Sequence, residues 1–238
     1  MRAASRAETL WGTLRQTAPH LGLVLRHMKP TWHVNALGSI TPAFLALHGI
    51  RGIIWDVDGT LTAYHDARVA RTSESALHVL LSNPTLRHVI VSNSPESRFA
   101  ALGTMLPSVP ALRVYALGRA LHVRTLLGAV DSMAPDTLAV LLNGGAYALR
   151  KPNAALVRSA LQLLGCGASQ AVMIGDQYLT DIAGAGMTNV RSIKVATIVP
   201  SSFPLSIRSA QVVEHALYAL RHGMRPAAID HPVRDADG

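Results

Sequence analysis

The chain has 238 residues, 49% of them hydrophobic, so it can bury the core of one domain with a small insertion, which excludes a wholly disordered chain. Its single cysteine, Cys166, excludes an internal disulfide and a zinc site built on paired thiols, and it indicates a reducing, cytoplasm-like compartment. The formal charge of +8 favours anionic partners, which are phosphate esters, acidic lipid surfaces or nucleic acid.

Residues 1–32 form a basic N-terminal segment that we expect to be helical. Arginines and a lysine outnumber the lone acid, Glu8, and apolar side chains lie between them. Three interpretations stay open: a surface helix packed on the core, a basic helix on an anionic membrane, or a cleaved transit peptide. No apolar run reaches the roughly 18 to 20 residues that a membrane-spanning helix requires, so we expect a soluble or peripheral protein.

Three short apolar runs predict buried parallel strands, at residues 49–56, 87–93 and 170–176. Helical periodicity lies between and after them, so the strands belong to βαβ units. This alternation predicts an α/β fold, a Rossmann-like parallel sheet with helices on both faces. Because functional residues gather beyond the carboxyl ends of such strands, we expect the polar residues that end these runs to meet in one crevice.

The remaining segments complete a domain over residues 33–223 with an insertion at about 112–147. In the insertion we expect strands at 112–117 and 138–142 around a helix at 120–130. It would form a small lid or, by preference, an edge unit of the sheet. Further on we expect a strand at 191–199, an amphipathic helix at 209–220 with Val212, Val213, Ala216, Leu217 and Leu220 on one face, and a disordered tail at 224–238.

The run that ends the first strand, Asp56-Val57-Asp58-Gly59-Thr60-Leu61-Thr62, resembles the DxDGT signature of the haloacid dehalogenase (HAD) superfamily of phosphatases. The resemblance implies that Asp56 is a nucleophile that takes up the phosphoryl group. It implies that Asp58 protonates the leaving oxygen and later activates water. Thr60, in the same motif, is expected to support the site.

Ser92, Asn93 and Lys151 match two further motifs of the superfamily, in the order it requires. The resemblance implies that the Ser92 hydroxyl binds a phosphoryl oxygen. Asn93 and Arg98, just after Ser92, are candidates to orient a substrate head group, and a solvated helix face is the alternative for both. The resemblance also implies that the ammonium of Lys151 offsets the negative charges of nucleophile and phosphate. Each motif alone also fits an ordinary turn or helix start, but their ordered occurrence favours the phosphatase interpretation.

The last motif begins at Gly175-Asp176 and ends at Asp181. The resemblance implies a Mg²⁺ ion held by Asp56, the backbone carbonyl of Asp58 and Asp176, with Asp181 in support. Hard oxygen ligands suit Mg²⁺, which bridges to phosphate while it keeps several waters.

Over about residues 33–200 the chain also resembles the YqeG-like subfamily IIIA, which includes the mitochondrial phosphatidylglycerophosphate phosphatases. Two departures stand out: Gly59 replaces the usual Asn, and the interval from Ser92 to Lys151 is longer than the subfamily needs. The interval from Asp58 to Ser92 has no room for a large cap, so we expect an open site that admits bulky substrates.

These features predict that the protein is a Mg²⁺-dependent phosphate monoester hydrolase. The preferred substrate is phosphatidylglycerophosphate, and we expect peripheral contact with anionic phospholipid. We expect a cytoplasmic protein, or one in the mitochondrial matrix if the source is eukaryotic. Two alternatives stay open, a soluble metabolite phosphatase and a HAD-fold binding protein without turnover. The basic charge is dispersed and carries no interleaved aromatic residues, which argues against nucleic acid.

Overall fold

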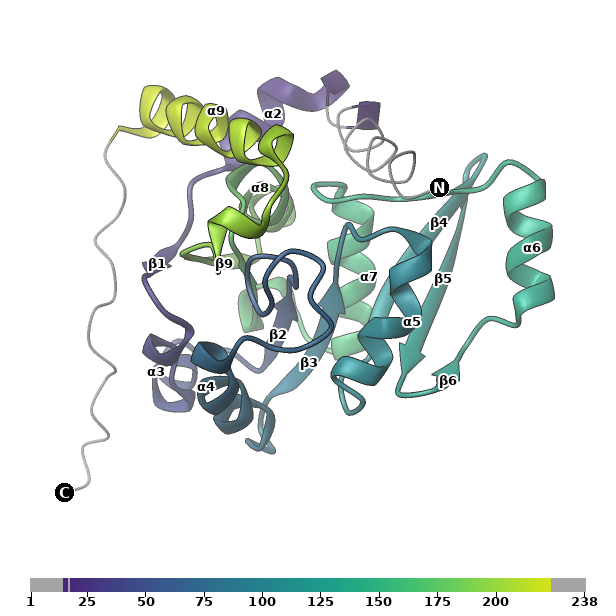
Figure 1. Ribbon diagram of the computed structural model, residues 1–238, viewed down its shortest axis with the longest axis horizontal. Helices are drawn as coiled ribbons and strands as arrows, with labels where there is room; N and C mark the ends of the chain where they lie inside the picture. Colours follow the sequence, from purple (N-terminus) through teal and green to yellow (C-terminus); the bar gives the residue numbers. More distant parts are fainter. Residues whose placement is uncertain (1–14, 17, 224–238) are drawn as a thin grey trace.

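A mixed β-sheet runs through the middle of the structure, a computed structural model that describes residues 15–16 and 18–223 (Figure 1). Among these residues the strand order is β1-β9-β8-β2-β3-β4-β5-β6, with β7 paired to β4 off this path. The strands are β1 (Trp32–Val34), β2 (Gly52–Trp55), β3 (Arg87–Val91), β4 (Ala111–Leu117), β5 (Ala120–Leu127), β6 (Val130–Asp131), β7 (Tyr147–Ala148), β8 (Ala171–Gly175) and β9 (Arg191–Val195). From β1 to β4 in this order the strands run parallel, whereas β5, β6 and β7 are antiparallel to their partners.

Helices cover both faces of the parallel strands, as the alternation in the sequence predicts (Figure 1). The α-helices are α2 (Leu21–His27), α3 (Pro42–Leu47), α4 (Arg71–Leu81), α5 (Glu96–Met105), α6 (Pro135–Asn143), α7 (Ala154–Leu164), α8 (Ala183–Gly186) and α9 (Leu205–His222), and a π-helical turn, η4, spans Tyr178–Ile182. Side chains of α3, α4 and α5 join one hydrophobic cluster with the sheet, and those of α7 and α8 join another. The expected α/β architecture is confirmed.

The strand β2 shows why the sheet is rigid at its centre. Ile53 and Trp55 belong to the cluster on one face and Ile54 to the cluster on the other, because successive side chains of a strand point in opposite directions. All three side chains are fully buried. Burial on both faces fixes the register of β2 against β3 and β8, and it therefore fixes the position of Asp56, the next residue in the chain.

The segment at 112–147 widens the sheet with antiparallel strands and adds α6 at the outer side (Figure 1). Two predictions for it are wrong: residues 120–130 contain strands β5 and β6 instead of a helix, and 138–142 lie in helix α6 instead of a strand. Gly118, with φ +58°, turns the chain so that Leu117 pairs with Ala120 in a hairpin. Pro135 opens α6 at a position where a helix needs no backbone N–H.

Helix α9 lies with its predicted apolar face outward. Val212 is 71% exposed and Leu220 is 86% exposed, while Glu214 and Tyr218 are buried. The Glu214 carboxylate accepts the backbone N–H of Leu179 at 2.9 Å, and Tyr218 stacks on the ring of Tyr178 at a centroid distance of 4.3 Å. These contacts with η4 set the rotation of the helix and leave Val212 and Leu220 on its outward side, while the helix predicted at 209–220 lies within α9.

At the N-terminal side, α2 packs beside α8 and α9, and its Val24 is fully buried. Residues 1–14 and 17 of the basic segment and the expected tail at 224–238 lie outside the described residues, so the transit-peptide, membrane and tail predictions stay predictions. None of the helices in residues 18–223 is long and apolar enough to cross a membrane.

Candidate active site

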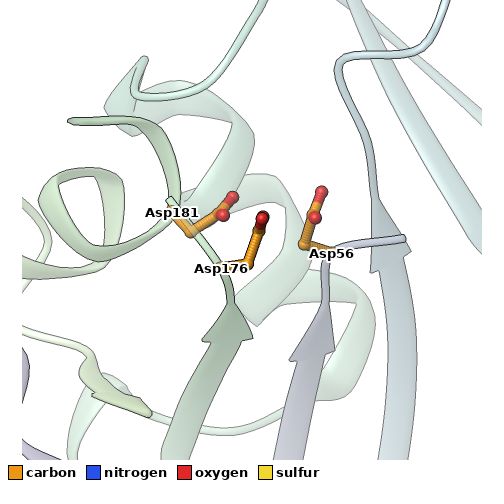
Figure 2. Close-up of side chains that lie close together, drawn as sticks. All are labelled: Asp56, Asp176 and Asp181. Carbon is orange, nitrogen blue, oxygen red and sulfur yellow. The ribbon is translucent and has the colours of Figure 1, made fainter. Parts of the chain in front are cut away.

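Three aspartates lie side by side beyond the ends of two neighbouring strands (Figure 2). Asp56 directly follows β2, Asp176 directly follows β8, and Asp181 lies in η4. Because β2 and β8 are parallel neighbours, their carboxyl ends open at the same edge of the sheet. One carboxylate oxygen from each residue lies within 4.8 Å of the others. The sequence predicts that Asp56 and Asp176 come together, and the structure places them so.

The ammonium of Lys151 lies inside this cluster and is almost completely buried. It forms ion pairs with Oδ1 of Asp56 and, at 2.6 Å, with Oδ1 of Asp181. Burial lowers the pKa of Lys151, but the charges of Asp181 and Asp56 raise it further, and the net result is a raised pKa. Lys151 therefore stays a cation, and it offsets part of the negative charge that three carboxylates bring together.

Lys151 reaches this position through the antiparallel edge of the sheet. β7 pairs with β4, and the backbone N–H of Leu149 donates to the Val114 carbonyl at 2.8 Å. The side chain of Asn93 then accepts the N–H of Lys151 at 2.7 Å and donates to its carbonyl at 3.1 Å. Asn93 is expected from the sequence to contact substrate, and in the structure its amide holds the lysine backbone.

Thr60 and Asp58 occupy different positions around the nucleophile candidate. The Thr60 hydroxyl donates to Oδ2 of Asp56 at 3.0 Å, and so it fixes the carboxylate. The Asp58 side chain has other partners: its Oδ1 accepts the His65 N–H and an Arg98 Nη2–H, each at 2.8 Å. The backbone carbonyl of Asp58 remains the atom that the sequence assigns to a metal ion.

The pKa of the Asp58 carboxyl group lies above its usual range. Burial raises its pKa to about 6, although the Arg98 guanidinium and the His65 N–H lower it in part. A carboxyl group that titrates near neutrality can both give and take a proton under the same conditions. Arg98 is thus an ion-pair partner of Asp58. The sequence suggests Arg98 only as a contact for a substrate head group.

Ser92 follows β3, the neighbour of β2 on the side away from β8. Its hydroxyl accepts the backbone N–H of Ser94 at 3.2 Å. The residue therefore stands at the same edge of the sheet as Asp56, one strand further along. The three strand ends therefore lie at one edge of the sheet, as the sequence predicts.

The chemistry of the cluster fits a divalent cation. Oδ1 of Asp176 is buried and has no hydrogen-bond partner among the described residues, and Oδ2 lies 3.5 Å from the Gln211 amide. Burial, followed by the charge of Asp56, raises the pKa of Asp176 to about 8. Burial and Asp56 also raise the pKa of Asp181, to about 6. The charge of Lys194 partly lowers the pKa of Asp176, and the hard oxygens of three carboxylates this close and this buried suit Mg²⁺.

Three residues contribute to the site in ways that differ from the sequence prediction or are absent from it. Asp181 is predicted as a supporting residue, yet its oxygen joins the aspartate cluster directly. Gln211 and Glu214 come from α9, and both lie close enough to act on Asp176. The acid of the last motif gives a signal for Asp181, but nothing in the pattern of residues 209–220 indicates that α9 borders the site.

Comparisons with known proteins found partial matches. Residues 148–215, which include Lys151, Asp176 and Asp181, match a family model described as HAD-hydrolase-like. Phospholysine phosphohistidine inorganic pyrophosphate phosphatase from Rattus norvegicus is 45% identical over 47 residues, which are 20% of this chain and 17% of that protein. The chain thus spans about a sixth of the length of this curated relative.

A solved structure of an uncharacterized protein from Listeria monocytogenes serotype 4b is 14% identical, with a TM-score of 0.37, over 70% of this chain and 99% of that chain. The residues that match the family model include β8, η4 and β9, and with them Asp176 and Asp181. The match shows that residues 148–215, less than a third of the chain, are similar to HAD-like hydrolases.

Proposed function

We propose that the protein is a Mg²⁺-dependent phosphatase that hydrolyses phosphate monoesters through an aspartyl phosphate on Asp56. The observation that carries this proposal is the buried cluster in which Asp56 meets Lys151, Asp176 and Asp181. The partial match to a phosphatase supports the same reaction class.

The reaction uses two carboxyl groups of the first motif in turn. An oxygen of Asp56 attacks the phosphorus atom, and the bond from phosphorus to the ester oxygen breaks. Asp58 gives its proton to that leaving oxygen. Water then attacks the phosphorus of the aspartyl phosphate while Asp58 takes up a proton, and inorganic phosphate leaves as Asp56 is restored.

The other residues hold charge and position. Lys151 stabilises the negative charge that gathers when phosphate approaches Asp56, and the Ser92 hydroxyl binds a phosphoryl oxygen. Asp56, Asp176 and the Asp58 carbonyl would hold Mg²⁺, with Asp181 beside them. When bound, the ion neutralises charge on the phosphoryl oxygens.

For the substrate we propose phosphatidylglycerophosphate, with peripheral contact at a membrane surface. The subfamily resemblance suggests this lipid, and the outward face of α9 gives a physical reason. Val212, Val213 and Leu220 are exposed on the helix whose Gln211 borders Asp176. An apolar stripe on a surface helix of a basic protein is suited to the interface of an anionic membrane, and here it would bring the site to the lipid head groups.

The test measures phosphate release by the purified full chain with Mg²⁺ and with EDTA. Substrates are vesicles that contain phosphatidylglycerophosphate and a panel of soluble sugar and nucleotide monophosphates. Asp56→Asn should abolish release, whereas Asp136→Asn, an exposed acid on α6, should not change it. Turnover of the vesicles alone supports the lipid, and turnover of the panel alone supports a soluble metabolite phosphatase.

The other class of function is a binding protein on this fold that does not turn over substrate. The intact pair Asp56 and Asp58, with a pKa for Asp58 of about 6, argues for catalysis instead. If the wild type releases no phosphate from any monoester with Mg²⁺, the proposal fails and the function as a binding protein is favoured.

A further inference from the structure

A cavity of about 220 Å³ adjoins the candidate active site on the side of β4. Its lining includes Ser92, Glu96, Arg113, Tyr115 and Arg150. Ser92 belongs to the proposed phosphoryl site, so the cavity begins where the phosphoryl group of a substrate would lie. It therefore extends in a direction that the rest of a bound substrate can take.

The cavity exists because β4 continues beyond the end of β3. The two strands pair only through Ile90 with Ala111 and Val91 with Leu112. The rest of β4 rises past the edge where Ser92 lies. Arg113 and Tyr115, two residues apart on this part of β4, point to the same face and line the cavity.

Glu96, the one acidic residue in the lining of the cavity, already has hydrogen-bond and ion-pair partners. Glu96 accepts hydrogen bonds from Arg113 at 2.7 Å and from the Tyr115 hydroxyl at 2.6 Å, and it forms an ion pair with Arg124. Burial raises the pKa of Glu96, but these donors outweigh it and the net pKa is lowered, so the group stays a carboxylate. The negative charge of Glu96 is therefore paired with side chains of the cavity wall.

Arg150 has a different environment. Its Nη1 donates to the Asn93 carbonyl at 2.7 Å, and it forms no ion pair with a carboxylate among the described residues. It is half-buried, and the nearby Arg113 is a like charge. A guanidinium has five N–H donors, so several remain available toward the cavity. A half-buried cation in this position gains most from an anion that arrives with a ligand.

We propose that this cavity binds a second anionic group of the substrate, a carboxylate or a phosphate carried by the alcohol that leaves, and that Arg150 selects for it. The inference rests on the proposed phosphatase function. It narrows the substrate class to phosphate monoesters with a second oxyanion near the ester. Both soluble metabolites and phospholipid head groups can supply that chemistry.

The test uses short alkyl phosphates of two to four carbons that differ only at the far end, which carries a hydroxyl, a carboxylate or a phosphate. The wild type should hydrolyse the anionic members with a kcat/KM about ten- to hundredfold above that of the hydroxyl member, as expected for one charge-assisted contact. Comparison of the carboxylate and phosphate arms identifies the preferred oxyanion.

Arg150→Gln should lower this preference about tenfold or more, and Arg150→Lys should restore part of it. The test compares the ratio of kcat/KM for an anionic member to kcat/KM for the hydroxyl member. A displaced Lys151 would slow all members alike and would leave this ratio unchanged. Arg51→Gln, which removes the same charge at the exposed amino end of β2, should keep the full preference.

Equal kcat/KM values across the series in an active wild type would overturn the inference and leave the phosphatase proposal intact. An unchanged ratio in Arg150→Gln would overturn the assignment of Arg150. Absence of turnover for every member, with Mg²⁺ present, would instead overturn the proposed function itself.

Discussion

The side-chain amide of Asn93 bonds the backbone of Lys151 on both sides, accepting its N–H at 2.7 Å and donating to its carbonyl at 3.1 Å. The residue after one strand end thereby fixes a residue far along the chain, whose ammonium lies between Asp56 and Asp181. An asparagine is suited to this task because its amide carries both a donor and an acceptor.

Asn93→Ala should therefore reduce both stability and activity. Loss of two hydrogen bonds to a partly buried backbone costs about 1–3 kcal/mol of unfolding free energy. Release of Lys151 should also lower kcat for phosphate release. Urea unfolding and steady-state kinetics measure the two effects, with Asn143→Ala, an exposed residue at the end of α6, as the control. Equal stability and kcat for the two variants would contradict this positioning role.

Lys151→Met should destabilise the metal-free protein strongly. Removal of the buried cation leaves Asp56 and Asp181 close together without their shared partner, which costs about 3–5 kcal/mol at neutral pH. Urea unfolding in EDTA measures the loss, and Lys29→Met, on the surface, should show almost none. Added Mg²⁺ should return more stability to Lys151→Met than to the wild type. A variant as stable as the wild type in EDTA would show that the cluster does not need this charge.

The strand ends could be predicted from the sequence because their signal is local. A buried parallel strand reads as an apolar run, and the polar residue that stops it, such as Asp56 or Asp176, is adjacent in the chain. Each of these two carboxylates therefore lies directly beyond the end of its strand. The same locality explains why α7, which begins behind the Asn153 cap, lies where the periodicity indicates.

The pairings across the site could not be predicted, because they depend on contacts between distant segments. The Arg98–Asp58 ion pair needs the first turn of α5 to face the loop after β2. The cavity lined by Arg150 needs β4 to pair with β3 over two residues only. Helix α9 turns its apolar side outward because Glu214 and its neighbours contact η4, which no periodicity of α9 reveals.

Stability of the metal-free protein should fall as pH rises toward 8. The pKa of Asp176 is raised from 3.8 to about 8 by burial and by Asp56, so the folded state binds more protons than the unfolded state within that window. Stability present below about pH 4 is therefore lost progressively up to the folded pKa. Urea midpoints in EDTA at pH 5 to 8.5 measure the trend.

Mg²⁺ should weaken or reverse this trend, because a bound cation favours the charged form of Asp176. Asp176→Asn should be less sensitive to pH in EDTA than the wild type and should respond less to Mg²⁺. Urea midpoints that increase with pH in EDTA would rule out a buried, repelled carboxyl group at this position.

Arg98→Met should raise the pKa of Asp58 above its value of about 6, because burial already raises it and the Arg98 charge opposes that effect. The first step needs Asp58 protonated when the leaving group is an alkoxide. The alkaline limb of the kcat/KM profile for an alkyl phosphate should therefore move to higher pH. Arg158→Met, on the exposed side of α7, should leave the limb in place. A limb that is unmoved in Arg98→Met would assign it to another group.

Gly59 stands at the position where the subfamily resemblance leads one to expect Asn, and the structure gives a reason for glycine. Its φ is +89°, and a Cβ there would lie 2.5 Å from Oδ2 of Asp176 and 2.9 Å from the Phe203 ring. Gly59→Ala should therefore combine backbone strain of about 1 kcal/mol with displacement of the Asp176 carboxylate.

Gly118→Ala separates these two effects, because Gly118 has a φ of +58° but no atom within 4 Å of its added Cβ. Both variants should lose stability in EDTA, yet only Gly59→Ala should bind Mg²⁺ about tenfold more weakly, as titration calorimetry or the Mg²⁺-dependent shift in the urea midpoint would measure. The close contact of the added Cβ is with a carboxylate oxygen of Asp176, so we expect it to weaken Mg²⁺ binding more than it destabilises the fold. Equal Mg²⁺ affinity in the two variants would mean that Asp176 tolerates the displacement or does not bind the ion.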